Sequence, residues 1–195
     1  MGPGNAANFQ QLRDWISEQE EAPTYKDIWE VFPSLAGRYK SAVLDAIELF
    51  GKRSPLVVGE LREWQRNLHN TVSLEPNDRE IIFVVDEQGN TGKSWLCRYW
   101  MSHRPGTQFL SVGKRDDLAY SIDPECDLFV FDIPRGSMEY LQYSVLEQLK
   151  NRVVFSPKYV SRTKQLKSNC HIVIFSNEQP DMTKMTEDRY TLVNI

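Results

Sequence analysis

The chain has 195 residues, of which 41% are hydrophobic and 26% charged, a composition typical of a globular protein and not of a disordered tail. No apolar run approaches the roughly 18 residues that a membrane-spanning helix needs, and the first residues lack a secretory signal pattern, so we expect no membrane partner. Three widely spaced cysteines (Cys97, Cys126 and Cys170) fit neither a disulfide framework nor a CxxC-type metal site.

The charge is unevenly distributed along the chain. The formal net charge is −4, yet the thirty residues from Gln148 to Asn177 contain no Asp or Glu and carry +6, which leaves −10 for the remainder. A local basic segment on an acidic body suits a protein that contacts a polyanion at one place. The plainer interpretation is a solvated cationic hairpin.

The first third of the chain is predicted to be helical. We expect residues 1–7 to be a tag or linker and residues 8–50 to form a small all-α domain, because apolar residues recur there at helical spacing. Pro23 with Thr24 and Pro33 with Ser34 mark helix starts, so three short helices are predicted. Residues 51–59 contain two glycines and a proline and are predicted to be a connector.

The pattern changes in residues 60–195. A helix is predicted over 60–72, and continuous apolar runs of strand length follow at 80–86, 107–112, 127–133 and 171–177. Helical segments are predicted between them at 93–103, 114–122 and 137–151. Apolar strands that alternate with helices predict an α/β domain with a mostly parallel sheet covered on both faces.

The segment "VVDEQGNTGKSW", residues 84–95, ends a predicted strand and opens a predicted helix, which is the context of a phosphate-binding loop. In such a loop the glycines let backbone N–H groups face the phosphates, the Lys reaches the β- and γ-phosphates, and the hydroxyl takes Mg²⁺. Glu87 stands where the usual motif has its first glycine. We therefore expect ATP and Mg²⁺ as cofactors, bound through Gly89, Asn90, Thr91, Gly92, Lys93 and Ser94.

A nucleotide hydrolase also needs a carboxylate near the metal at the end of a neighbouring strand. Asp132 ends the run "DLFVFD" and is predicted to share the metal with Ser94. Many such motifs carry a second acid, but Ile133 and Pro134 follow here. The general base therefore stays open between Asp132, acting through a water, and Glu147.

Two further residues are candidates for catalysis. Asn177 follows the last predicted strand, where its amide could orient the attacking water or sense the γ-phosphate; alone, it would be interpreted as a turn residue before Pro180. Arg189 could be an arginine finger from a neighbouring subunit, or a surface salt-bridge partner. Their order and spacing with Lys93 and Asp132 favour the functional interpretation.

The basic segment is a candidate for contact with nucleic acid. Residues 151–169 lie between the strand of Asp132 and the strand of Asn177, where a hairpin could project from the sheet. Lysines there would bind phosphates and an aromatic ring could pack on a sugar or base. The predicted DNA contacts are Lys158, Tyr159, Lys164 and Lys167.

Several blocks together resemble a known family. "NDREIIFVVDEQGNTGKSWLCRYW", "GKRDDLAY", "FVFDIPRGSMEYLQYSVLEQLKNRVVFSPKY", "IVIFSNEQPD" and "TEDRYTLVNI" are similar, in that order, to the helicase domain of replication-initiator (Rep) proteins of circular single-stranded DNA viruses. The likeness is strongest to nanovirus and alphasatellite Reps and more distant to circovirus Reps. In that family the position of Glu87 tolerates a residue other than glycine, and "DIPR" is usual among nanovirus-like members.

The resemblance implies a superfamily 3 helicase with an ASCE/AAA+-type, five-stranded P-loop ATPase fold. It implies a homo-hexameric ring that translocates 3′ to 5′ on single-stranded DNA during rolling-circle replication, located in the host cell nucleus, with residues 8–50 serving oligomerisation. Carried over by position, Gly89 to Ser94 match Walker A, Asp132 Walker B and Asn177 the motif C sensor. Lys158 matches the hairpin lysine, and Arg189 looks like the arginine finger.

Complete Reps also carry an endonuclease domain, whose His-hydrophobe-His and Tyr-x-x-Lys motifs are not found in this sequence. We therefore expect the chain to be a fragment with oligomerisation helices and ATPase. Two alternatives stay open. One is a nucleotide-dependent assembly module that binds single-stranded DNA with little or no unwinding; the other is a cellular phosphate-loop ATPase of a different superfamily.

Overall fold

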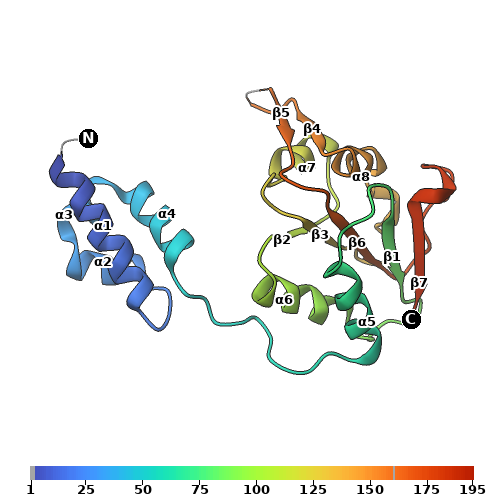
Figure 1. Ribbon diagram of the computed structural model, residues 1–195, viewed down its shortest axis with the longest axis horizontal. Coiled ribbons are helices and arrows are strands. Elements are labelled where there is room, and N and C mark those ends of the chain that lie inside the picture. Colours follow the sequence, from blue (N-terminus) through green and yellow to red (C-terminus); the bar gives the residue numbers. More distant parts are fainter. Residues whose placement is uncertain (1–2, 160) are drawn as a thin grey trace. The chain divides into compact units, whose positions relative to one another are not determined.

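The computed structural model describes residues 3–159 and 161–195. The chain divides into two compact units, the first ending at Ser54 and the second beginning at Pro55 (Figure 1). Of the residues expected to be a tag, the first two lie outside the described residues, and the first helix already begins at Pro3.

The first unit contains four helices in its described part, where the sequence predicted three: α1 (Pro3–Glu18), α2 (Tyr25–Val31), α3 (Pro33–Arg38) and α4 (Lys40–Phe50). Two starts are as predicted, since Thr24 caps α2 in a capping box with Asp27 and Pro33 opens α3. The extra break falls at Tyr39, whose backbone leaves helical geometry with φ −132° and ψ 47°. Gly37 lies two residues before it, in the last turn of α3.

The helices of the first unit enclose a core of their own. One face of each contributes to it, and the fully buried side chains are Leu12, Ile16, Ile28 and Val43. The outward faces mix charged residues with exposed apolar side chains, among them Trp29, Leu44 and Leu49. All residues of this core lie between Phe9 and Ile47, so it is built within the unit.

The second unit is built on a parallel sheet, as predicted. Its strands are β1 (Ile81–Val85), β2 (Thr107–Leu110), β3 (Leu128–Asp132), β6 (His171–Ser176) and β7 (Tyr190–Asn194). In the described residues they form a five-stranded sheet in the order β2-β3-β6-β1-β7, with every neighbouring pair parallel. One strand, β6, therefore lies between the strand before the phosphate loop and the strand of Asp132, which is the ASCE arrangement.

Helices cover both faces of the sheet (Figure 1). α5 (Glu63–Val72) and α6 (Lys93–His103) lie on one face, and α7 (Arg115–Ser121) and α8 (Tyr143–Lys150) lie on the other. Side chains of β1 alternate between the two cores, Ile82 and Val84 toward α5 and α6, Ile81 and Phe83 toward the opposite helices. This explains why the strands are apolar without interruption.

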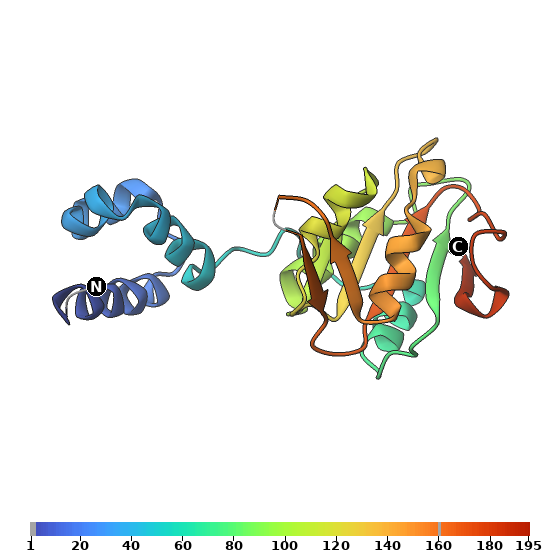
Figure 2. The same cartoon turned by 90° about the horizontal axis from the view of Figure 1, so that it is seen from above.

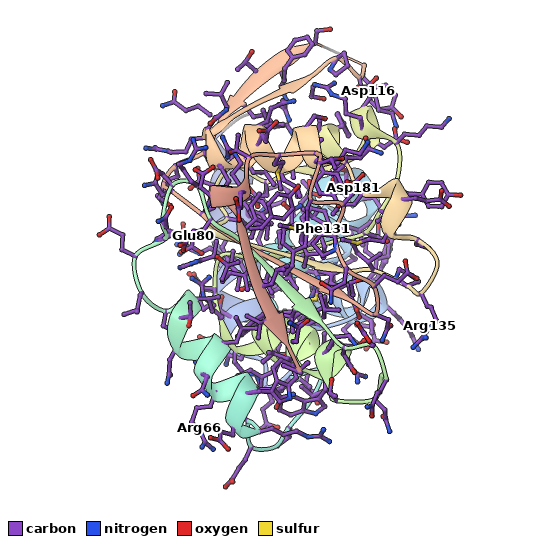
Figure 3. The ribbon with its side chains drawn as sticks, turned by 90° about the vertical axis from the view of Figure 1, so that its right-hand side faces the viewer. Arg66, Glu80, Asp116, Phe131, Arg135 and Asp181 are labelled. Carbon is purple, nitrogen blue, oxygen red and sulfur yellow. The ribbon has the colours of Figure 1, made fainter. Side chains whose placement is uncertain are left out.

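One helix was predicted too long. The segment 137–151 forms a short 3₁₀ turn, Met138–Tyr140, and then α8, with an extended residue, Leu141, between them. Leu141 is buried in the same core as Phe131 of β3, which lies inside the unit in Figure 3.

Among the described helices, none is both long and apolar enough to cross a membrane.

The basic segment forms the predicted hairpin. β4 (Val153–Ser156) and β5 (Arg162–Gln165) pair antiparallel as a separate two-stranded sheet, visible as two adjacent strands in Figure 2. Val154 and Leu166 anchor its base in the core beneath α7 and α8. The described tip residues Lys158 and Tyr159 contact Asp117 and Tyr120 of α7.

Candidate nucleotide-binding site

The loop between β1 and α6 has the backbone of a phosphate cradle. Gly89, Asn90 and Gly92 all have positive φ, at 89°, 66° and 99°. Glycine takes this conformation without steric cost, and asparagine tolerates it better than most residues. The loop runs directly into the first turn of α6, whose free N–H groups and dipole favour an anion.

Asp86 organises this loop from its buried end. The carboxylate has no exposed surface and accepts hydrogen bonds from Gly89 N at 2.7 Å, Thr91 Oγ1 at 2.6 Å and Lys93 Nζ at 2.8 Å. Burial alone would raise the pKa of Asp86, but the hydrogen bonds from Lys93, Thr91 and Gly89 lower it well below its ordinary value. The carboxylate is therefore charged, and it neutralises Lys93.

The sequence reasoning missed Asp86. A signal was available, because an acid that directly follows a continuous apolar strand is placed at the buried end of the loop and needs a cationic or N–H partner there. Lys93, seven residues later, and the loop amides are those partners.

Helix α5 supports the loop from the outside. Arg62 donates to Thr91 O at 2.7 Å, and the buried amide of Gln65 donates to Gly92 O at 3.0 Å. A Cβ on Gly92 would lie 2.9 Å from Gln65 Nε2, closer than packed atoms allow. Only glycine fits at position 92, because φ is positive there and α5 leaves no room for a side chain.

The predicted residues meet in one pocket of about 590 Å³ at the carboxyl ends of β1, β3 and β6. Lys93 comes from the start of α6, Asp132 from the end of β3 and Asn177 from the turn after β6, whose side-chain amide donates to Asp86 O. The predicted members of its lining are Gly89, Asn90, Gly92, Lys93, Ser94, Asp132 and Asn177. Thr91 is absent from the lining because its hydroxyl is bonded to Asp86.

The oxygens predicted to hold Mg²⁺ are available. In the described part of the chain, neither the Ser94 hydroxyl nor the Asp132 carboxylate has a hydrogen-bond or ion-pair partner, although both residues line the pocket. No group of three or more His, Cys, Asp or Glu side chains suited to a metal occurs among the described residues. Ser94 and Asp132 offer two oxygens, which would suffice for Mg²⁺ at a nucleotide site because phosphates and waters complete its shell.

Arg189 and Glu147 lie apart from this pocket and pair with each other. Arg189 Nε is 3.4 Å from Glu147 Oε1, and the arginine is only 8% exposed. Its Nη1 is buried and has no hydrogen-bond partner among the described residues. Neither side chain lines the pocket, where Asp132 is the carboxylate contributed by the described residues.

The hairpin lysines have three different environments. Lys158 forms an ion pair with Asp117 of α7 and its Nζ lies 5.1 Å from the ring centre of Tyr159, which is 79% exposed. Lys167 pairs with Glu125 on the open surface. Lys164 is buried and donates to the carbonyls of Tyr120 and Ile122 at the end of α7. The DNA-contact prediction for Lys164 is therefore corrected, because its ammonium holds the hairpin to α7.

The sequence of the chain is similar to those of known proteins. No model of a protein family matches the chain. It is 40% identical over 139 residues to Para-Rep C7 of Faba bean necrotic yellows C7 alphasatellite and 38% identical over 138 residues to Para-Rep C10 of Milk vetch dwarf C10 alphasatellite. Each match covers 69% of this chain and 48% of the relative, so the chain spans about half the length of these proteins.

Solved structures are only weakly similar. The C-terminal region of NrS-1 gives a TM-score of 0.42 over 74% of this chain and 41% of that one. NtrX from Brucella abortus, in complex with ADP, gives 0.39 over 83% and 42%. Both are 13% identical to this chain in sequence, so the assignment to a group of relatives rests on sequence similarity alone.

Over about 70% of its length, the chain is homologous to the Para-Rep proteins of alphasatellites, the Rep-like proteins of circular single-stranded DNA satellites.

Proposed function

We propose that the unit beginning at Pro55 binds Mg²⁺ and ATP and hydrolyses ATP to drive a DNA helicase of the Rep type. The observation that carries this proposal is the convergence of Lys93, Asp132 and Asn177 on one pocket above a loop with the backbone of a phosphate cradle. Homology to the Para-Reps supports the same conclusion independently.

Each side chain has a task that its position favours. Lys93 exchanges Asp86 for the β- and γ-phosphates, while Asp86 keeps its bonds to Gly89 and Thr91 and so preserves the loop. Bound Mg²⁺, held by Ser94 and Asp132, would offset the charge of the phosphates. Asn177 lies beside the loop, where its amide orients the attacking water, and Asp132 accepts the proton through a water.

The remaining parts of the proposal concern DNA and assembly. Lys158, Tyr159 and Lys167 at the exposed hairpin bind single-stranded DNA, and the ring moves 3′ to 5′ during rolling-circle replication in the host cell nucleus. The first unit would drive ring assembly into a hexamer. Its surface supports this, because Leu49 is 73% exposed and Leu44, Phe50 and Trp29 are also exposed.

The test is ATP turnover with Mg²⁺, with and without single-stranded DNA. Replacing Lys93 alone would leave the Asp86 charge buried without its partner, so the informative variant is Lys93→Met combined with Asp86→Asn. We expect this variant to lose at least about 100-fold in turnover, as does loss of one charge-stabilising donor in other enzymes. Ser94→Ala should lose turnover with little change in fold, because Ser94 is exposed. Unchanged turnover in both variants would contradict the proposal.

One observation favours a second function. In the described residues, Asp132 is the sole carboxylate that lines the pocket. A site with one acid could bind nucleotide as a structural clamp, which would make the chain a nucleotide-dependent assembly module for single-stranded DNA. Assembly and DNA binding that are equal with ATP and with a slowly hydrolysed analogue, without unwinding in either case, would favour this alternative.

A further inference from the structure

A second cation faces the phosphate loop from the loop that follows β3. Arg135 is exposed, lines the same pocket as Lys93 and Asp132, and donates from Nη2 to Glu87 O at 3.1 Å. It lies at the edge of the unit in Figure 3, three residues beyond Asp132. The arginine thus links the loop after β3 to the first residue of the phosphate loop.

The donors of Arg135 and Asn177 converge on one point of that loop. A methyl group built on Gly89 would lie 3.6 Å from Asn177 Nδ2 and 3.9 Å from Arg135 Nη2. Gly89 is the first glycine of the loop, and Lys93 lies at the opposite end of the loop. The Asp86 carboxylate accepts hydrogen bonds from both, from Gly89 N and from Lys93 Nζ. Asn177 is predicted to sense the γ-phosphate, and a donor of Arg135 beside the Asn177 amide is placed to reach the same phosphate.

The segment that carries Arg135 is itself fixed. Gly136, with φ 76°, donates its N–H to the Glu178 carboxylate, and the Ser176 hydroxyl donates to Glu178 O at 2.8 Å. These bonds connect the loop after β3 to the turn after β6 that carries Asn177. Arg135 and Asn177 are consequently held as a pair, although they are 42 residues apart in the chain.

The other cations near the pocket have different positions. Lys93 is the loop lysine, which the proposed site shares between the β- and γ-phosphates, and Arg189 is buried against Glu147 outside the pocket. Arg98 also lines the pocket, but its Nε donates to Ser94 O within its own helix. Arg135 is exposed, and its one hydrogen bond within the described residues is to a backbone carbonyl, so most of its five N–H donors are available to a phosphate.

We propose that Arg135 binds the γ-phosphate of ATP from within the same subunit and so distinguishes the triphosphate from the diphosphate. This inference rests on the proposed nucleotide site. Sensing of the γ-phosphate was predicted for Asn177 and charge stabilisation from a neighbouring subunit for Arg189, so Arg135 is an additional residue at the terminal phosphate. Because Arg135 acts within its own subunit, its effect on nucleotide affinity should not depend on protein concentration.

The experiment compares the affinities of the whole chain for ADP and for a slowly hydrolysed ATP analogue, both with Mg²⁺, in Arg135→Ala and Arg135→Lys. Arg66→Ala is the matched control, since Arg66 is likewise an exposed arginine with one bond to a backbone carbonyl, Leu61 O at 3.0 Å, and lies outside the pocket (Figure 3). We expect Arg135→Ala to weaken the triphosphate about ten- to hundredfold, the range for charge-assisted bonds, and ADP less than threefold.

Arg135→Lys should recover part of the preference, because lysine keeps the charge but loses the planar fork. Measurements at two protein concentrations should give the same result. An unchanged triphosphate preference in Arg135→Ala, with normal nucleotide binding, would overturn this inference alone. The inference would also be overturned if Arg189→Ala, and not Arg135→Ala, lost the preference for the triphosphate over ADP, and if that loss became larger at the higher protein concentration. Failure of the unsubstituted chain to bind either nucleotide would overturn the proposed function itself.

Discussion

At the scale of single residues, the pair of Asp86 and Lys93 determines the state of the phosphate loop. Both are buried, and their charged atoms are 2.8 Å apart. A buried charge without a partner is costly, so each residue depends on the other until phosphate arrives. An anion that takes Lys93 must therefore compete with Asp86, and the net affinity for nucleotide reflects that exchange.

Asp86→Asn should destabilise the second unit by about 1–3 kcal/mol at pH 7, the usual cost of leaving a buried group unsatisfied. The pKa of Asp86 is lowered by folding, so its stabilising effect is complete above the unfolded value of about 3.9 and is lost as the pH falls below that value toward the folded pKa. Urea unfolding of both proteins at pH 7 and near pH 3 checks this. The difference between them should shrink at the lower pH; an equal difference at both would contradict it.

Gly92 provides a second residue-level test. Gly92→Ala should destabilise the loop and weaken nucleotide binding, because φ is 99° and the new methyl group would meet Gln65 Nε2 at 2.9 Å. Gln65→Ala removes the clash but also the hydrogen bond from Gln65 to Gly92 O, and it leaves the strain in φ. Thermal unfolding should therefore show that Gly92→Ala costs less in the Gln65→Ala chain than in the unsubstituted chain; an equal cost in both would mean that backbone conformation alone explains the loss.

At the scale of elements, the hairpin shows how one basic segment divides between structure and surface. Lys164 is buried on β5 and closes the end of α7, whereas Lys158 lies at the tip beside Tyr159 and Tyr120. Burial lowers the pKa of Lys164, while the bond to Asp117 raises that of Lys158. The two lysines should therefore respond differently to substitution.

Lys164→Met should lower thermal stability by orphaning two carbonyl groups, at about 1–3 kcal/mol. Lys158→Ala should leave stability nearly unchanged but weaken binding to single-stranded DNA and reduce its salt dependence by about one unit of slope. Fluorescence anisotropy over a range of salt concentrations measures the second effect. Equal salt slopes in Lys158→Ala and the unsubstituted chain would exclude a phosphate contact by Lys158.

The elements also show what could be predicted from sequence. Helix α6 was predicted to the residue, because the phosphate loop determines its start. Strand β7 was not named as a strand, since it is an edge strand with mixed exposure and no continuous apolar run. The Lys164 error has a related cause: charge predicts exposure, but a long side chain at an inward position can bury its stem and bond backbone carbonyls. The break at Tyr39 was missed because the apolar spacing continues across it, although Gly37 lies two residues before it.

At the scale of the whole molecule, two units with separate cores imply separable roles. The first has a small core and several exposed apolar side chains, while the second contains the complete pocket. Leu49→Glu should therefore abolish assembly without changing helix content or nucleotide affinity, because Leu49 is mostly exposed. Light scattering after size exclusion measures the assembly. Retention of the oligomer would remove the first unit from the assembly mechanism.

The central claim is that the loop from Gly89 to Ser94 holds the phosphates of ATP, and a structure with a slowly hydrolysed ATP analogue and Mg²⁺ tests it most directly. The account predicts that Lys93 Nζ leaves Asp86 for the phosphates, with Ser94 and Asp132 beside the metal and Arg135 at the terminal phosphate. Asp86 should keep its bonds to Gly89 and Thr91. Nucleotide bound elsewhere, or Lys93 still paired with Asp86 and without phosphate contact, would contradict the account.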